Sequence, residues 1–153
     1  RGLGDVYKRQ LVLTPEEWVR RHLLVFLVER CGACAKRIVQ EYPVRLNGQP
    51  QRADVVVVDA AGQPLLLAEC KAPDVKLDGR TLAQAVRYNS VLGARYILLT
   101  NGLNHYCYAC HDGQCLPLGA FPDLSDSSDD ASCGAPEVPA AGAKPEEPGH
   151  SAL

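Results

Sequence analysis

Residues 53–71 read ADVVVVDAAGQPLLLAECK, in which two apolar runs, 55–58 and 65–68, flank a short polar stretch. Continuous apolar runs of this length, bounded by turn-forming residues, are typical of buried strands. The Ala61-Gly62 step between them predicts a tight hairpin with a two-residue loop. We therefore expect two antiparallel strands at the centre of the fold.

The chemistry of this hairpin lies at its open end. A two-residue loop pairs Ala60 with Gln63, so the numbers of facing residues sum to 123 and Asp54 lies opposite Glu69. Directly opposed residues on antiparallel strands share a face, with Cβ atoms about 5 Å apart. Lys71 lies on that face as well, because side chains alternate along a strand. Two carboxylates so close together repel each other unless a cation lies between them.

Such a cation would be a hard divalent metal ion. The carboxylates of Asp54 and Glu69 and the backbone carbonyl of Cys70 are oxygen ligands of the kind that Mg²⁺ takes, and they leave positions for waters and a phosphate oxygen. Lys71 would then orient or help deprotonate an attacking water and balance charge on a phosphoryl group. On the spacing alone an alternative stays open, in which the three side chains form surface ion pairs on a solvated hairpin.

The flanking sequence predicts an α/β domain. Thr14-Pro15-Glu16-Glu17 is a helix start with Thr as N-cap, and apolar residues then recur at intervals of three and four as far as about Arg30. A short helical turn near 35–39 and an extended segment at 42–46 precede the hairpin. A second amphipathic helix is expected over 81–92, a strand over 95–100, and one or two strands within 105–118. The order α-β-β-β-α-β-β predicts a central mixed β-sheet flanked by helices.

The composition divides the chain into three parts. Residues 1–10 do not join the pattern and are expected to be a non-native or flexible tail. Residues 11–120 form the domain, and the 46% hydrophobic content of the 153 residues is enough for one core. From 121 to 153 an acidic sequence rich in Pro, Ala and Ser predicts disorder. Net charge is −6 in this tail and +4 before it, so the folded part is mildly basic, as suits a phosphate-bearing partner.

Seven cysteines are present, and no export signal or bilayer-length apolar segment is visible. We therefore expect a cytoplasmic protein without membrane association and without a structural disulfide. Cys31-x-x-Cys34 and Cys107-x-x-Cys110, with His111 and Cys115 nearby, have the outward form of a split zinc site. Two cysteines three apart on one strand would face opposite ways, so buried thiols are the favoured interpretation.

Five segments stand in the order and spacing of one known family: TPEEWVR at 14–20, RADVVV at 52–57, LAECKAP at 67–73, QAVRYN at 84–89 and LLTNG at 98–102. Over about 11–118 the chain resembles the N-terminal nuclease domain of type I restriction endonuclease R subunits, within the PD-(D/E)XK nuclease superfamily. The resemblance implies a restriction-endonuclease-like core and Mg²⁺-dependent hydrolysis of DNA, with Mn²⁺ as a substitute. The family's catalytic Asp and Glu-x-Lys fall on Asp54, Glu69 and Lys71, and Ala53 replaces its Pro.

The resemblance also implies supporting residues. The family's Gln-x-x-x-Tyr motif matches Gln84 and Tyr88, which lie one helical turn apart and which in relatives help to position DNA or the metal centre. A Glu on the first helix often completes such sites. Glu17 is our candidate, with Glu29 and Glu41 as alternatives.

DNA is the partner that the resemblance implies, and a separate motor or specificity subunit is compatible with it. R subunits carry an ATP-driven translocase, but this chain lacks the Gly-x-x-x-x-Gly-Lys-Ser/Thr loop, so we expect no ATP-dependent activity from this polypeptide alone. Many nucleases of this class act as homodimers, although no residue here marks an interface. Two alternatives stay open, namely a non-catalytic nucleic-acid-binding or assembly module of the same fold and a small zinc-binding interaction domain.

Overall fold

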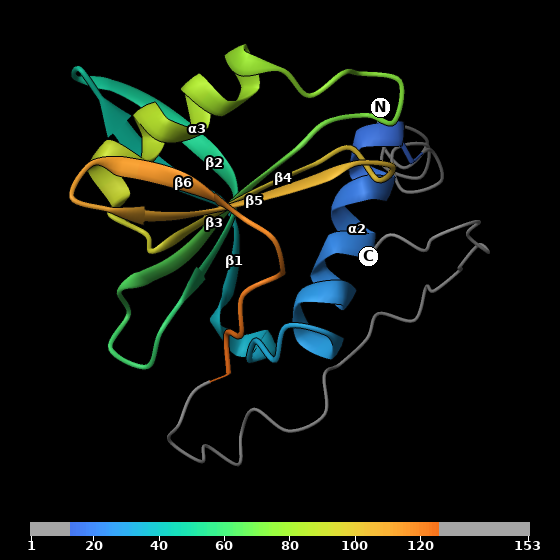
Figure 1. Ribbon diagram of the computed structural model, residues 1–153, viewed down its shortest axis with the longest axis horizontal. Coiled ribbons are helices and arrows are strands. Elements are labelled where there is room, and N and C mark those ends of the chain that lie inside the picture. The colour runs from blue at the N-terminus through green and yellow to red at the C-terminus, as the bar shows by residue number, and fades with distance from the viewer. Residues whose placement is uncertain (1–12, 126–153) are drawn as a thin grey trace, which may run out of the picture.

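The computed structural model describes residues 13–125 and arranges six strands in one sheet, in which each strand lies beside the next one in the chain (Figure 1). The strands are β1 (Ile38–Leu46), β2 (Gln49–Val58), β3 (Pro64–Cys70), β4 (Tyr96–Thr100), β5 (His105–His111) and β6 (Gln114–Leu118). Only β3 and β4 are parallel. A parallel pair needs a long crossover, and helix α3 (Gly79–Leu92) supplies it.

This mixed sheet with a helix on each face is the restriction-endonuclease-like core that we expected. The stretch 105–118 forms two strands, β5 and β6, so the sheet has one strand more than the shortest predicted order. The turn predicted near 35–39 is the short 3₁₀ helix η1 (Ala35–Arg37), which leads directly into β1. No helix within residues 13–125 combines the length and apolar character that a membrane crossing requires.

Helix α2 (Pro15–Glu29) covers one face of the sheet. The Thr14 hydroxyl accepts a hydrogen bond from the Glu17 amide at 3.1 Å, which caps the helix as the sequence predicts. Its apolar stripe is buried in one core, which includes Val19, Leu23, Phe26 and Leu27 of α2 together with Val55, Val57, Leu66, Ala68, Cys70, Leu98 and Cys107 of the sheet. We call this the α2 core.

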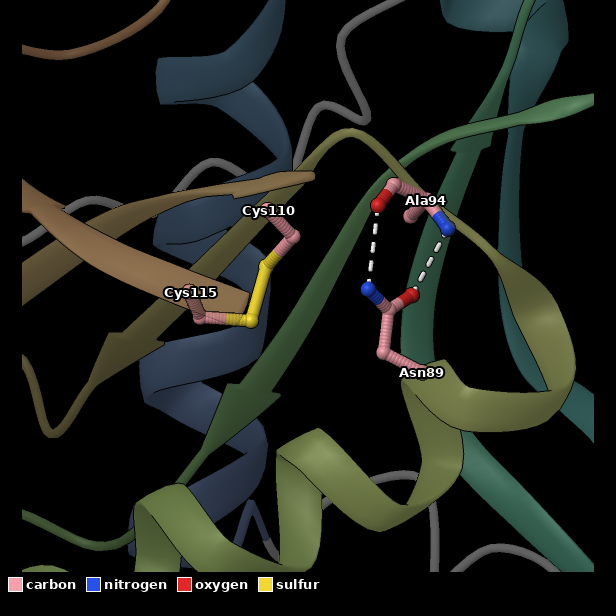
Figure 2. The surroundings of a disulfide bond; sticks show 4 residues. All are labelled: Asn89, Ala94, Cys110 and Cys115. Carbon is pink, nitrogen blue, oxygen red and sulfur yellow. Dashed lines mark hydrogen bonds between the residues drawn. A yellow bond between two sulfur atoms is a disulfide. The ribbon is translucent and has the colours of Figure 1, made fainter. Parts of the chain in front are cut away.

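Helix α3 covers the opposite face and closes a second core, the α3 core. It contains Ala85 and Tyr88 of the helix with Val44, Ala53, Val56, Leu67, Ile97 and Leu99 of the sheet. At the end of α3, Gly93 takes a left-handed conformation, with φ of 69°. The buried Asn89 side chain then exchanges two hydrogen bonds with the Ala94 backbone, at 3.0 and 2.7 Å, and fixes the entry into β4 (Figure 2).

The β2–β3 hairpin has the predicted register near its open end. Val55 pairs with Ala68 and Val57 with Leu66, so the sum of 123 holds there. Towards the loop the register shifts between Val57 and Val58, and Val58 pairs with Pro64. This irregularity is a β-bulge, which places one extra residue on β3.

The two-residue loop, with Ala60 paired to Gln63, is wrong. The Asp59 amide instead donates to the Gln63 carbonyl at 2.8 Å. The Asp59 carboxylate accepts hydrogen bonds from the amides of Ala61 and Gln63, both at 2.9 Å, and closes a wider turn. The bulge offsets the longer loop, so the predicted register survives although the predicted turn does not.

Residues 121–125 pack against α2, although we assigned them to the acidic tail. The Phe121 ring meets the Phe26 ring edge to face at 4.8 Å. Leu124 is buried in the α2 core, and its amide donates to the Cys31 carbonyl at 2.7 Å. These two apolar side chains cover the helix, which composition averaged over the tail does not reveal. The predictions for 1–10 and for the rest of the tail lie outside the described residues.

The expectation of no structural disulfide is also wrong. Cys110 and Cys115 form a disulfide between β5 and β6 (Figure 2). They face each other in the hairpin register, with Cα atoms 4.0 Å apart, a proximity that an argument from cellular compartment does not address. Across residues 13–125 no three His, Cys, Asp or Glu side chains are grouped as a metal site would require, so the split zinc site is not assembled there.

Candidate functional site

Asp54 and Glu69 lie side by side at the open end of the β2–β3 hairpin. The Asp54 amide donates to Glu69 Oε2 at 3.2 Å, and the Cys70 amide donates to Asp54 Oδ2 at 2.8 Å. Each carboxylate therefore accepts a hydrogen bond from the backbone of the opposite strand. These contacts extend the hairpin beyond the last regular pair, Val55 with Ala68, and they hold the two side chains in place.

The backbone of β2 changes its facing at Asp54. Val55 packs in the α2 core and Ala53 in the α3 core, although residues two apart on a regular strand share a face. On the neighbouring strand Glu41, which the register places opposite Asp54, has a positive φ of 54°. Asp54 thus lies where β2 changes its facing and where the neighbouring residue of β1, Glu41, has an irregular backbone conformation.

Glu69 is buried beside another acid. Only 8% of it is exposed. Burial and the negative charge of Asp54 raise the pKa of Glu69 to about 8, while the hydrogen bond from the Asp54 backbone and the charge of Lys71 act in the opposite direction. Glu69 therefore holds its proton more tightly than an exposed glutamate does, as expected for two carboxyl groups that share one site.

Lys71 completes the predicted group of three. Its amide donates to the Thr100 carbonyl at 2.9 Å, which continues the parallel pairing of β3 with β4 beyond Cys70. Lys71 is half-buried, and its charge is close enough to lower the pKa of Glu69. The structure thus gathers Asp54, Glu69 and Lys71 at one end of the hairpin.

Arg20 on α2 is a further charged group near this site, and we did not predict it. Its guanidinium donates to both carboxylate oxygens of Glu17 at 2.7 Å and lies 3.7 Å from Glu41. Burial lowers the pKa of Arg20, but the hydrogen bond to Glu17 and the charges of Glu17, Asp54 and Glu41 outweigh burial and raise it. The available signal was the spacing of three residues between Glu17 and Arg20, which places both on one helical face.

The predicted acid of the first helix does not join the pair. The Glu17 carboxylate is bound by Arg20, and within residues 13–125 no three acidic, His or Cys side chains are grouped as metal ligands. Glu41 forms ion pairs with Arg20 and with Arg52, the latter at 3.3 Å. Glu29 lies exposed at the opposite end of α2. The structure therefore brings two carboxylates together, whereas Glu17 is bound by Arg20, whose charge interacts with that of Asp54.

The sequence of this domain matches a known protein family. Residues 15–122 match the family described as type I restriction enzyme R protein N terminus. The chain belongs to this family. No curated protein matches the chain significantly. The match spans helices α2 and α3 and the six strands of the described residues 13–125, so the family resemblance predicted from five short segments is confirmed.

The Gln-x-x-x-Tyr pair of this R-protein N-terminal domain forms an internal contact. Gln84 Nε2 donates to Tyr88 Oη at 2.8 Å. Tyr88 is only 5% exposed and belongs to the α3 core, as do Ala53 and Leu67. Because Ala53 precedes Asp54 and Leu67 lies two residues before Glu69, Tyr88 supports the strands that carry the two acids.

Asn101 is a second residue of the R-protein N-terminal domain whose role we did not predict. Its Oδ1 accepts hydrogen bonds from the amides of Leu103 and Asn104, at 2.9 and 2.7 Å. Its Nδ2 donates to the Val75 carbonyl at 2.8 Å. Asn101 thus fastens the β4–β5 turn to the segment that leads from Lys71 to α3, and the family segment LLTNG was the available signal.

Proposed function

We propose that this R-protein N-terminal domain is a Mg²⁺-dependent endonuclease that hydrolyses phosphodiester bonds in DNA. The observation that supports this most is the pair of carboxyl groups at Asp54 and Glu69, which backbone amides fix side by side, with Glu69 buried at a cost that a divalent cation would relieve. The hard oxygen donors suit Mg²⁺ or Mn²⁺. Membership of a restriction-enzyme family agrees with the proposal.

Each residue of the site has a distinct role in this proposal. Asp54, Glu69 and the Cys70 carbonyl would hold the cation, which when bound polarises the phosphoryl group and acidifies a water molecule. Lys71 orients that water and offsets negative charge at the phosphoryl group. Losing the proton from Glu69 is a precondition for metal binding, because only the carboxylate is a good ligand.

Three further residues act on the site indirectly, namely Arg20, Gln84 and Tyr88. The charge of Asp54 is one of those that raise the pKa of Arg20, and the contacts of Arg20 with Glu17 and Glu41 fix its position. Tyr88, held by Gln84, packs behind the two acid-bearing strands. We propose that these three residues position the site, and that Glu17 acts by holding Arg20.

DNA is the proposed substrate, and the subunit context follows from the family. Type I restriction enzyme R proteins are the proteins whose N terminus this family describes. We therefore propose that the domain works with motor and specificity functions that lie outside these 153 residues. A homodimer that cuts both strands is the simplest arrangement for a domain acting alone, and the cytoplasm is the compartment in which it would meet DNA.

One observation favours a second candidate function. Among residues 13–125 only two acids gather, and the third predicted acid is bound to Arg20. A non-catalytic DNA-binding or assembly module would keep the fold and lose metal-dependent turnover. Metal-dependent cleavage separates the two candidates, since the module would retain DNA without cutting it.

The first test is a calorimetric titration of Mg²⁺ and Mn²⁺ into the wild type, Asp54→Asn and Asp59→Asn. Asp59 is a matched control because it lies on the same hairpin at the loop end and accepts only local amides. We expect binding to the wild type and to Asp59→Asn, and loss of binding in Asp54→Asn. Equal binding by all three folded proteins, or by none of them, would contradict a metal centre at Asp54.

A further inference from the structure

A small cleft opens between the start of α3 and the strands β4 and β5. Its walls are mostly apolar and aromatic and include Leu77, Leu82, Leu99, Tyr106 and Tyr108. Its volume is about 140 Å³. A cavity of roughly 150 Å³ in another protein accommodates a benzene ring, so this cleft has the size for one flat aromatic group.

The cleft lies in line with the carboxyl pair. Glu69 is paired with Leu99 on β4, and Leu99 is paired with Tyr106 on β5. Directly paired residues share a face, so Glu69, Leu99 and Tyr106 form one row across three strands. Neighbouring strands are about 4.8 Å apart, which puts Glu69 and Tyr106 on the order of 10 Å from each other. A group in the cleft would therefore lie within the reach of one nucleotide or two from a phosphate at Asp54 and Glu69.

Tyr106 offers an accessible ring at the mouth of this cleft. It is 46% exposed, whereas Tyr108 two residues later packs against the α3 core. Leu77 and Leu82 also pack against that core and form the wall near the ring. An exposed aromatic ring beside an apolar wall can hold a planar group by stacking.

Two basic residues are next in sequence to residues that line the cleft. Lys76 precedes its wall residue Leu77, Arg80 follows Gly79, and both basic residues are exposed. The Asp78 carboxylate at the rim is engaged in capping α3, where it accepts hydrogen bonds from the Arg80 and Thr81 amides. An apolar cleft with basic residues next to its lining in the sequence suits a ligand that combines a planar apolar group with phosphates.

We propose that the cleft binds one unpaired nucleobase of a DNA strand that lies across the Asp54–Glu69 site, with the Tyr106 ring stacked on the base. This inference rests on the proposed function, because it uses DNA as the ligand of that site. Stacking on an aromatic ring discriminates little among bases. The cleft therefore selects single-stranded or locally opened DNA, and it contributes no preference for a particular sequence.

The test measures fluorescence anisotropy of a short labelled oligothymidylate and of an abasic oligonucleotide of equal length, in EDTA so that no metal-dependent cleavage occurs. Tyr106→Leu keeps apolar volume and removes the ring, Tyr106→Phe keeps the ring, and Leu116→Ala alters an exposed apolar residue that does not line the cleft. We expect Tyr106→Leu to bind oligothymidylate about tenfold more weakly. Tyr106→Phe and Leu116→Ala should bind as the wild type does, and the abasic strand should bind equally to all four proteins.

Unchanged binding of oligothymidylate by Tyr106→Leu, or an equal loss for the abasic strand, would overturn the nucleobase site, as would absence of binding by the wild type. Cleavage of the same oligothymidylate in Mg²⁺ is measured separately. Cleavage without any dependence of binding on Tyr106 removes this inference and leaves the nuclease proposal intact. Binding that depends on Tyr106, without any cleavage, supports the nucleobase site and contradicts the nuclease proposal. Thermal unfolding of each variant verifies that the fold persists.

Discussion

An aspartate borders each end of the run of valines in β2, and the two aspartates have different surroundings. Asp59 lies at the loop, and its carboxylate accepts hydrogen bonds from the amides of Ala61 and Gln63. Asp54 lies at the open end, where its carboxylate accepts one amide hydrogen bond, from Cys70, and adjoins the carboxyl group of Glu69. One aspartate is satisfied by its own turn, whereas the other shares its place with a second acid.

This difference separates a structural acid from a candidate ligand. Short-range amides stabilise the charge of Asp59 and leave no demand for a cation. At Asp54 the neighbouring Glu69 is buried and its pKa is raised, so the negative charges of this site are disfavoured unless a divalent ion balances them. Both border the same run of valines, so the predicted register, which places Asp54 opposite Glu69, is what distinguishes them in the sequence.

The largest expected effect comes from removing Lys71, at the open end of the hairpin. In the nuclease proposal, Lys71→Ala removes the group that orients water and offsets phosphoryl charge, so we expect Mg²⁺-dependent cleavage of plasmid DNA to fall by about 100-fold or more. Asp59→Asn, measured in parallel, should cleave as the wild type does. Undiminished cleavage by a folded Lys71→Ala protein would remove the role assigned to this residue.

The second prediction concerns the pH dependence of stability in metal-free protein. The pKa of Glu69 is raised from 4.5 to about 8 in the folded state, so the stability associated with its protonated form is complete below 4.5 and is lost as the pH rises towards 8. Glu69→Gln imitates the protonated form and should not show this loss. Its stability advantage over the wild type should grow across this interval to roughly 2–4 kcal/mol.

Urea unfolding of both proteins in EDTA, at several pH values between 4 and 9, measures this difference. The difference between the two proteins reports the titration of the coupled pair of carboxyl groups, because the other titrating groups are common to both. A constant difference across the range would show that Glu69 ionises normally in the folded protein. It would also remove the argument that a cation relieves a buried acid pair.

Much of this site follows from the sequence because short-range rules act on it. The register that brings Asp54 to Glu69 was predicted from two apolar runs and a turn, and Thr14 caps α2 as expected. The turn itself was wrong, since the Asp59 carboxylate competes for the loop amides and a bulge then restores the register. The pairing at the site is therefore correct only because the bulge compensates for the longer loop. The spacing of residues in the sequence does not reveal this compensation.

The parts that were not predicted depend on contacts between distant segments. Arg20 comes close to Asp54 only because α2 packs across β2, and Asn101 reaches Val75 only because β4 lies beside β3. The facing of β2 reverses at Asp54 beside a positive φ at Glu41, which is a residue type without a preference for that conformation. Helical and strand periodicity carry no information on such contacts.

The smallest expected effect comes from changing Asp59, at the loop end of the hairpin. Asp59→Ala leaves the Ala61 and Gln63 amides to water, and because this turn is exposed the loss should be only about 1 kcal/mol of unfolding free energy. Urea unfolding measures the loss, and calorimetry should show unaltered Mg²⁺ binding. If Asp59→Ala instead abolished metal binding in a folded protein, the turn would control the register at the open end. The bulge would then be insufficient to keep Asp54 opposite Glu69, and the two ends of the hairpin would be coupled rather than independent.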